Sequence, residues 1–131
     1  MSTKKPTSTK LKKKLDKLFS EYIRRKNAKD EMCTCFTCGC TKHYKEMHAG
    51  HFQSRRFLSV RWDEVNVQPQ CPKCNLFSQG EQFKFGLYLN QKYGEGTAEG
   101  LQQRAHTIVK LSRVDYLEAI ENIKRKLKEL D

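Results

Sequence analysis

The sequence lacks a long apolar run. Its 131 residues are 37% hydrophobic and 31% charged, and the two kinds are so interspersed that no apolar stretch exceeds a few residues. A membrane-spanning helix needs about 20 consecutive apolar residues, so that class of protein is excluded. The basic N-terminal region also lacks the apolar stretch of a secretory signal. We therefore expect a reducing cytoplasm, where disulfides are rare.

Apolar side chains are too few to build a large hydrophobic core. A single small domain of this kind usually needs an additional staple. The chain contains six cysteines, which could serve as disulfides or as metal ligands. The expected reducing compartment favours the metal.

Acidic residues are also scarce, with 15 Asp and Glu against 26 Lys and Arg, so the formal net charge of +11 indicates a polyanionic partner. Residues 1–29 carry most of the excess, and their apolar residues recur at helical spacing. The pattern predicts an amphipathic helix over about 9–28, docked by its apolar stripe. Its basic face suits nucleic-acid phosphates, although a membrane-surface or calmodulin-like role would leave the same signature. The predicted nucleic-acid contacts here are Lys12, Lys13, Arg24 and Arg25.

Three further segments, at about 81–93, 97–109 and 114–130, show helical spacing of apolar residues. Local signals mark their ends, because Ser, Thr and Asp cap helix starts and glycine ends helices. The predicted caps are Thr7, Ser8 or Thr9 before the first helix, the Ser78–Glu81 and Ser112–Asp115 pairs before two others, and Gly94 as a stop.

Four cysteines form two C-x-x-C pairs, Cys35 with Cys38 and Cys71 with Cys74. Two intervening residues let a tight turn aim both sulfurs at one point, as tetrahedral zinc requires. We therefore predict a structural zinc ion bound by these four cysteines. The alternatives are disulfides or a thioredoxin-type redox pair, but the βαβ context of the latter is not visible.

Two cysteines remain, Cys33 and Cys40. Each lies two positions from a paired cysteine, with one residue between, a spacing that is poor for closing a zinc knuckle. We treat both as non-ligands, with a shift of one zinc ligand onto Cys40 as the open alternative.

The two pairs are separated by 32 residues, 39–70, more than the roughly 15–20 of a simple zinc ribbon. This insertion contains His48 and His51 in a segment, 47–52, that reads as extended. A second short strand at about 66–68 leads into the second pair, and Cys74 opens a helical turn. The expected order is strand, loop, strand, knuckle and helix, a ββα unit with zinc at its base.

His51, Asn66 and Asn75, bracketed by the cysteine pairs, resemble the HNH (ββα-metal) endonuclease motif. More specifically, the Cys-x-x-Cys-Gly, His-Ala-Gly-His-Phe, Arg-Trp-Asp-Glu-x-Asn and Gln-Cys-x-x-Cys-Asn motifs resemble the NinG/Rap recombination endonucleases of lambdoid bacteriophages. The resemblance covers roughly residues 33–93. It implies metal-dependent cleavage of branched or recombination-intermediate DNA, such as Holliday junctions, in the cytoplasm of a bacterial host.

The resemblance assigns the general base to His51. The residue before it is usually an acidic or imidazole metal ligand, but here it is Gly50. Alternate residues of a strand share a face, so we predict that His48 substitutes as a ligand, with Asp63 in reserve. Asn75 would supply a second ligand to Mg²⁺ or Mn²⁺ through its amide oxygen, with water and phosphate completing the shell.

The other site residues lie in the loop between the strands. Asn66 is predicted to hold this loop and orient His51 rather than to touch substrate, and Arg55, Arg56 and Arg61 are predicted to contact phosphate. Simpler interpretations remain: either histidine could be a further zinc ligand, and Asn75 could cap its helix.

The sequence thus predicts an α+β chain with a zinc-stapled ββα-metal core (HNH, treble-clef-like) flanked by N- and C-terminal helices. The expected divisions are a basic arm, 1–31, a nuclease core, 32–93, and a helical segment, 94–131. The leading function is an HNH endonuclease, a homodimer if it makes symmetric cuts in a four-way junction. The alternatives are a non-catalytic zinc-stapled nucleic-acid-binding module and an adaptor whose terminal helices pair.

Overall fold

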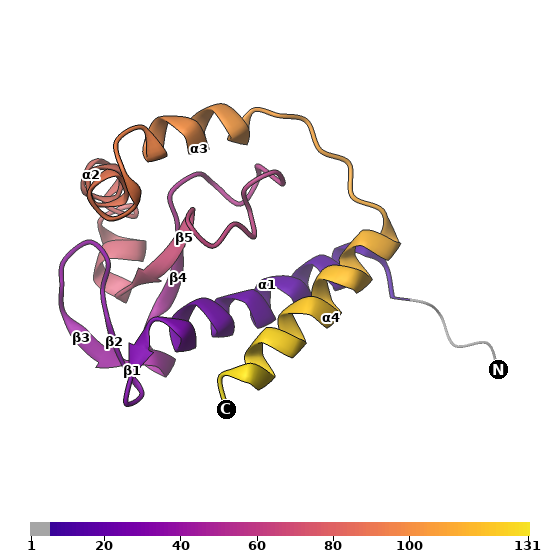
Figure 1. Cartoon of the computed structure of the whole chain (residues 1–131), viewed down its shortest axis with the longest axis horizontal. Coiled ribbons are helices and arrows are strands. Elements are labelled where there is room, and N and C mark those ends of the chain that lie inside the picture. The colour runs from indigo at the N-terminus through magenta and orange to yellow at the C-terminus, as the bar shows by residue number, and fades with distance from the viewer. Residues whose placement is uncertain (1–5) are drawn as a thin grey trace.

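The structure of the protein, a computed structural model, describes residues 6–131 (Figure 1). The first five residues of the predicted basic arm, 1–31, lie outside the described residues. Within the described part, no helix is long and apolar enough to cross a membrane.

The first and last helices are those that the sequence predicts. α1 spans Ser8–Lys26 and begins at Thr7, whose hydroxyl accepts a hydrogen bond from the Lys10 N–H at 3.2 Å. α4 spans Arg113–Glu129 and begins with the capping box of Ser112 and Asp115, as predicted. Each helix buries one apolar stripe. The buried residues are Leu11, Leu15, Phe19, Tyr22 and Ile23 in α1 and Tyr116, Ile120, Ile123 and Leu127 in α4.

α1 and α4 lie side by side and run in the same direction (Figure 1). At their starts the Arg113 side chain donates to the Pro6 carbonyl at 3.1 Å, and at their ends Arg25 pairs with Asp131 at 2.5 Å. Their stripes form one core with Val67. Two segments at opposite ends of the described chain therefore build a single layer.

The strands form two small antiparallel sheets. β1 (Ala28–Lys29), β2 (Met32–Thr34) and β3 (Thr41–His43) make the first, in that order, and a 3₁₀ turn, Tyr44–Glu46, follows. β4 (His48–His51) pairs with β5 (Val67–Gln70), so that His48 faces Gln70 and His51 faces Val67. Both strands of this second sheet pack on α1. A π-helix, Lys73–Phe77, follows β5, giving the strand, loop, strand and helix order that the sequence predicts.

A second core lies beneath two shorter helices. α2 (Gln82–Tyr93) and α3 (Thr97–Ala105) pack together around the loop between β4 and β5. Their buried residues gather around one loop side chain, Val60, in a cluster formed by Phe85, Leu89, Leu101 and Ala105. The chain is therefore of the α+β class, as predicted.

Two details of these helices differ from the sequence prediction. The Ser78–Glu81 capping box is wrong, because Glu81 adopts a left-handed conformation, φ 49°, and its side chain makes no capping hydrogen bond. The N–H of Ser78 instead donates to the Lys73 carbonyl and closes the π-helix. Gly94 ends α2 as predicted, at φ 113°, whereas α3 ends at Ala105, four residues earlier than expected.

One acidic side chain joins the β4–β5 loop to both long helices. The Glu64 carboxylate accepts from Tyr22 at 3.0 Å and pairs with Lys26 at 2.8 Å and Lys126 at 3.0 Å. Burial raises the pKa of Glu64, but the two lysines and the tyrosine outweigh it and lower the pKa to about 2.

Because this pKa is depressed, the stabilisation by Glu64 is present above the ordinary glutamate range and lost as the pH falls toward 2. We expect Glu64→Gln to reduce the free energy of unfolding at pH 7 by about 1 kcal/mol after solvent screening, and to flatten its pH dependence below about pH 5. Urea unfolding across this pH range measures both effects. Glu118→Gln, on the exposed side of α4, is the matched control, and equal stability curves for the two variants would contradict the assignment.

Candidate functional site

Four cysteine sulfurs gather in one place, between the first sheet and the start of the π-helix. The sulfurs of Cys35, Cys38, Cys40 and Cys71 all lie within 4.8 Å of one another, and the Cys38 and Cys71 sulfurs are 3.7 Å apart. Tetrahedral zinc with bonds of about 2.3 Å places its sulfur ligands about 3.8 Å apart. This group could therefore hold a zinc ion.

The group includes three of the four predicted ligands, with Cys40 in place of Cys74. Cys74 is buried beside the group, and its backbone N–H points to the Cys71 sulfur at 3.5 Å. The difference arises at Gly39, whose left-handed backbone, φ 81°, turns the chain so that Cys40 re-enters the cluster. The spacing of the cysteines does not show this turn. Two cysteines separated by one residue can bind the same metal ion only when the backbone reverses between them.

Zinc content distinguishes the two ligand sets. If Cys40→Ser loses zinc and Cys74→Ser keeps it, the four sulfurs gathered in the structure are the ligands. The reverse result supports the set predicted from spacing. Cys33 is buried in the same apolar cluster but lies outside the group of four, whereas Cys40, the other predicted non-ligand, lies within it, as the open alternative allowed.

The Cys35 thiol is prepared for metal binding. Burial raises its pKa, but hydrogen bonds from the backbone N–H groups of Cys71, Cys38 and Thr37 and from the Thr37 hydroxyl outweigh burial and lower the pKa to about 6. Because zinc binds thiolates, less free energy is needed to deprotonate this ligand near neutral pH.

A cleft of about 660 Å³ opens beside this centre, between α1, β4 and the start of the π-helix. It brings together residues that lie far apart in the sequence. Among the predicted site residues, the cleft is lined by Arg24, His48, His51, Arg55 and Asn75.

His48 and Asn75 meet across the cleft floor, with His48 Nδ1 3.0 Å from the Asn75 side-chain amide. A half-turn of that amide would present its oxygen in the same position. Adjacent ligands of an octahedral cation bound at about 2.1 Å are about 3.0 Å apart, so the pair fits two positions around Mg²⁺ or Mn²⁺. In the described part of the chain, no group of three His, Cys, Asp or Glu ligands forms here, so water and phosphate would supply the remaining positions.

His51 is held in one orientation. Its Nε2 lies 2.9 Å from the Arg61 carbonyl oxygen, and because a carbonyl only accepts, Nε2 carries the proton. In neutral His51 the other nitrogen, Nδ1, then has a free lone pair. Burial is the main cause that lowers the pKa of His51 below its ordinary value, so this neutral form predominates at pH 7.

Asn66 holds the loop that supplies this carbonyl. Fully buried, it accepts from the Gln53 N–H at 2.7 Å and donates to the carbonyls of Gln53 and Val60, each at 3.0 Å. Val60 precedes Arg61, the partner of His51. The geometry therefore supports the predicted role of Asn66, which holds the loop and positions His51 through it.

The structure also explains why position 50 is glycine. A β-carbon added there would lie 1.9 Å from Gln70 Oε1, because the Gln70 side chain occupies the space beside Gly50. Gln70 is fully buried and donates to the Thr37 hydroxyl at 3.0 Å and to the Gly80 carbonyl at 2.8 Å. It thus joins the first cysteine knuckle to the cleft wall, a role that sequence reasoning missed.

Gly50→Ala is expected to displace this amide and to lower the free energy of unfolding by about 1–3 kcal/mol, the range for disrupting buried hydrogen bonds. Gly50→Ala combined with Gln70→Ala should cost less than the sum of the two single changes, since the clash is then gone. Urea unfolding of the four proteins tests this. Additive losses would show that Gln70 is not what excludes a side chain at position 50.

The predicted phosphate-binding residues other than Arg61 divide into three groups. Arg24 and Arg55 line the cleft, and Arg56 borders an adjoining cavity that shares His51. Arg25 lies elsewhere, paired with Glu21 and Asp131. The lysines of α1, Lys12 and Lys13, do not line the cleft.

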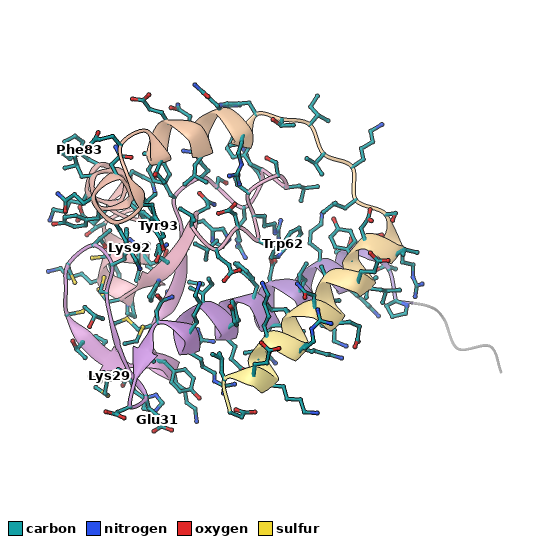
Figure 2. The ribbon with its side chains drawn as sticks, viewed as in Figure 1. Lys29, Glu31, Trp62, Phe83, Lys92 and Tyr93 are labelled. Atoms are coloured by element: carbon teal, nitrogen blue, oxygen red, sulfur yellow. The ribbon has the colours of Figure 1, made fainter. Side chains whose placement is uncertain are left out.

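Arg61 forms an ion pair with Asp16, a partner that sequence reasoning missed, so its guanidinium is not free to contact phosphate as predicted. Asp16, on α1, bonds the Arg61 guanidinium at 3.0 and 2.5 Å and the Trp62 indole N–H at 2.9 Å (Figure 2 labels Trp62). No local pattern predicts this contact across 45 residues, although Asp16 is one of only two acids in the basic segment 1–29, which was a signal.

Asp63, the reserve metal ligand, is also occupied: it accepts from the N–H groups of Val65 and Asn66 and pairs with Arg104. It does not line the cleft. The structure therefore keeps His48, and not Asp63, beside Asn75.

Comparison with known proteins places the chain in one family. The family model described as "Bacteriophage Lambda NinG protein" matches residues 2–131, so the chain belongs to the NinG family. No curated protein and no solved structure matches it significantly. Family membership agrees with the NinG part of the resemblance seen in the sequence motifs.

Proposed function

We propose that this NinG-family protein is a metal-dependent DNA endonuclease of the HNH type. The observation that carries the proposal is the orientation of His51: its Nε2 is bound to the Arg61 carbonyl, and its Nδ1 is left as a base in a cleft that also contains the His48–Asn75 pair. In this proposal β4, β5 and the π-helix are the ββα-metal unit, stapled by zinc.

Five of the residues that line the cleft have a role in the proposed phosphodiester hydrolysis. His51 accepts the proton of the attacking water at Nδ1, and the resulting positive charge is stabilised by the carbonyl that already binds Nε2. Arg24 and Arg55 bind and orient the DNA phosphates. His48 and Asn75 would hold Mg²⁺ or Mn²⁺, which would supply positive charge for the scissile phosphate and the leaving oxygen.

The proposed substrate is branched or recombination-intermediate DNA, in phage recombination. The family to which the chain belongs and the basic surface of α1 support this choice. Cutting a four-way junction symmetrically needs two active sites, so a homodimer is part of the proposal.

A cleavage assay tests the proposal. Linear duplex, single-stranded, forked and four-way-junction DNA are incubated with the zinc-loaded protein, with and without added Mg²⁺ or Mn²⁺. We expect cleavage only with the added cation and fastest on the branched substrates. Omission of the cation, rather than a strong chelator, keeps the structural zinc in place. Binding without cleavage of any substrate would favour the alternative, a non-catalytic zinc-stapled nucleic-acid-binding module.

His48→Ala is expected to raise the Mg²⁺ concentration needed for half-maximal cleavage by about 10–100-fold while the melting temperature stays within a few degrees of wild type. The reason is the loss of one of two protein ligands to the cation. His106→Ala, at an exposed histidine outside the cleft, is the matched control. An unchanged Mg²⁺ dependence in His48→Ala would exclude this histidine as a ligand.

A further inference from the structure

Two phenylalanines beside the cleft are almost fully exposed. Phe77, at the end of the π-helix, is 84% exposed and Phe83, in the first turn of α2, is 80% exposed. Leu76 and Leu87 are exposed as well, at 60% and 45%. We refer to these four residues as the apolar rim. Exposed apolar side chains of this size and number mark interaction surfaces.

The apolar rim adjoins the cleft. Asn75 lines the cleft immediately before Leu76 and Phe77, and Gln79 and Gln82 line it between the two phenylalanines. Phe83 lies on α2 at the outer edge of the molecule (Figure 2). Nucleic acid that reaches His51 and Asn75 would therefore pass next to these aromatic rings.

Folding does not require the apolar rim. α2 already buries Phe85 and Leu89, and its Gly86 packs against the ring of Phe52, 3.3 Å from the position of an added β-carbon. Phe83 and Leu87, four residues apart, share a different face of the helix, and that face is exposed. The exposed side chains are therefore available to a partner.

The charges near the apolar rim identify the kind of partner. Lys73 and Lys84 are exposed, each within three residues of a member of the rim, and the segment 73–93 contains one acid, Glu81. Two copies of such a surface would repel each other, whereas a polyanion would be attracted. A partner that is both polyanionic and aromatic is a nucleic acid with bases outside a duplex, since unpaired bases stack on aromatic side chains.

We propose that the apolar rim binds unpaired bases of DNA, with Phe77 and Phe83 as stacking platforms, and so directs branch points to the cleft. The proposal takes DNA as the partner from the proposed function and adds the feature of DNA that is recognised. It does not depend on cleavage, because it is tested as binding.

The experiment compares two DNA probes in buffer without Mg²⁺ or Mn²⁺. One is a forked duplex with 2-aminopurine at the first unpaired position, and the other is a linear duplex of equal length. For the full-length Phe77→Ala/Phe83→Ala protein we expect affinity for the fork to fall about tenfold or more, the effect of one lost stacking contact, while affinity for the duplex changes less than about twofold. Wild type should quench the 2-aminopurine fluorescence, and the variant should not.

Ile108→Ala, at a side chain that is 89% exposed outside the apolar rim, is the matched control and should leave both affinities unchanged. Equal losses on fork and duplex would overturn the proposal. Unchanged 2-aminopurine quenching in the Phe77→Ala/Phe83→Ala protein would overturn it as well. If that variant has also lost self-association in sedimentation, the surface is a contact between copies of the chain. If the wild-type protein cleaves none of the DNA substrates but still binds the fork selectively through Phe77 and Phe83, the proposed nuclease activity is refuted and this inference stands.

Discussion

Replacing His51 with alanine is expected to reduce the rate of Mg²⁺-dependent DNA cleavage by about 10²–10⁴-fold, the usual contribution of a general base. The loss follows from geometry, because the Arg61 carbonyl fixes Nε2 as the protonated nitrogen and leaves Nδ1 to accept a proton from water. Asn66 supports that carbonyl through Val60, so the base is oriented before DNA binds. Single-turnover cleavage of a branched substrate with protein in excess measures the chemical step.

The His51→Ala variant should bind DNA as tightly as wild type, since the imidazole holds no part of the phosphate backbone in this proposal. Wild-type activity should fall only in acid, below the ordinary histidine range, because burial lowers the pKa of His51. His106→Ala controls for the loss of a histidine outside the cleft. A wild-type cleavage rate in His51→Ala would show that the base lies elsewhere.

Replacing Cys71 with serine is expected to abolish zinc binding and to unfold the region around the cysteine cluster. Structural zinc supplies about 10–16 kcal/mol of apparent binding free energy in small domains, as much as the total stability of many of them. Cys71 belongs both to the group of four sulfurs and to the buried cluster around Met47. Zinc analysis and thermal melting with near-UV circular dichroism measure the two losses.

Cys33→Ser is the matched control, because Cys33 is as deeply buried but lies outside the group of four. It should keep the zinc of the wild-type protein, ~1 ion per chain, and lower the melting temperature by only a few degrees. A Cys71→Ser protein that retained zinc and melted like the control would remove zinc as the staple of this core.

Local patterns predicted the parts of the molecule that depend on local physics. The stripe of leucines in α1 and the capping box of α4 are short-range features, and both are present. Strand alternation predicted that His48 lies on the same face of the strand as residue 50, where a metal ligand was expected. In the structure His48 Nδ1 lies 3.0 Å from the Asn75 side-chain amide, the other predicted ligand.

What could not be predicted depends on contacts between distant segments. Asp16 meets Arg61 only because α1 packs on the β4–β5 sheet. A second contact of this kind is that of Gln70, whose side chain occupies the space beside Gly50, the position where the expected metal ligand is missing. Cys40 is a different case, because it joins the cluster through a local backbone reversal at Gly39, and the cysteine spacing had left a shift of one ligand onto Cys40 open.

The parallel pairing of α1 with α4 has a consequence for how the chain folds. α1 forms one wall of the cleft, yet its apolar stripe is covered by a helix synthesised roughly 90 residues later. Such high contact order delays the closing step, and until α4 has left the ribosome the leucines of α1 remain open to aggregation or to chaperones. Under the proposed function, the protein would therefore cut DNA only after α4 has left the ribosome and closed on α1.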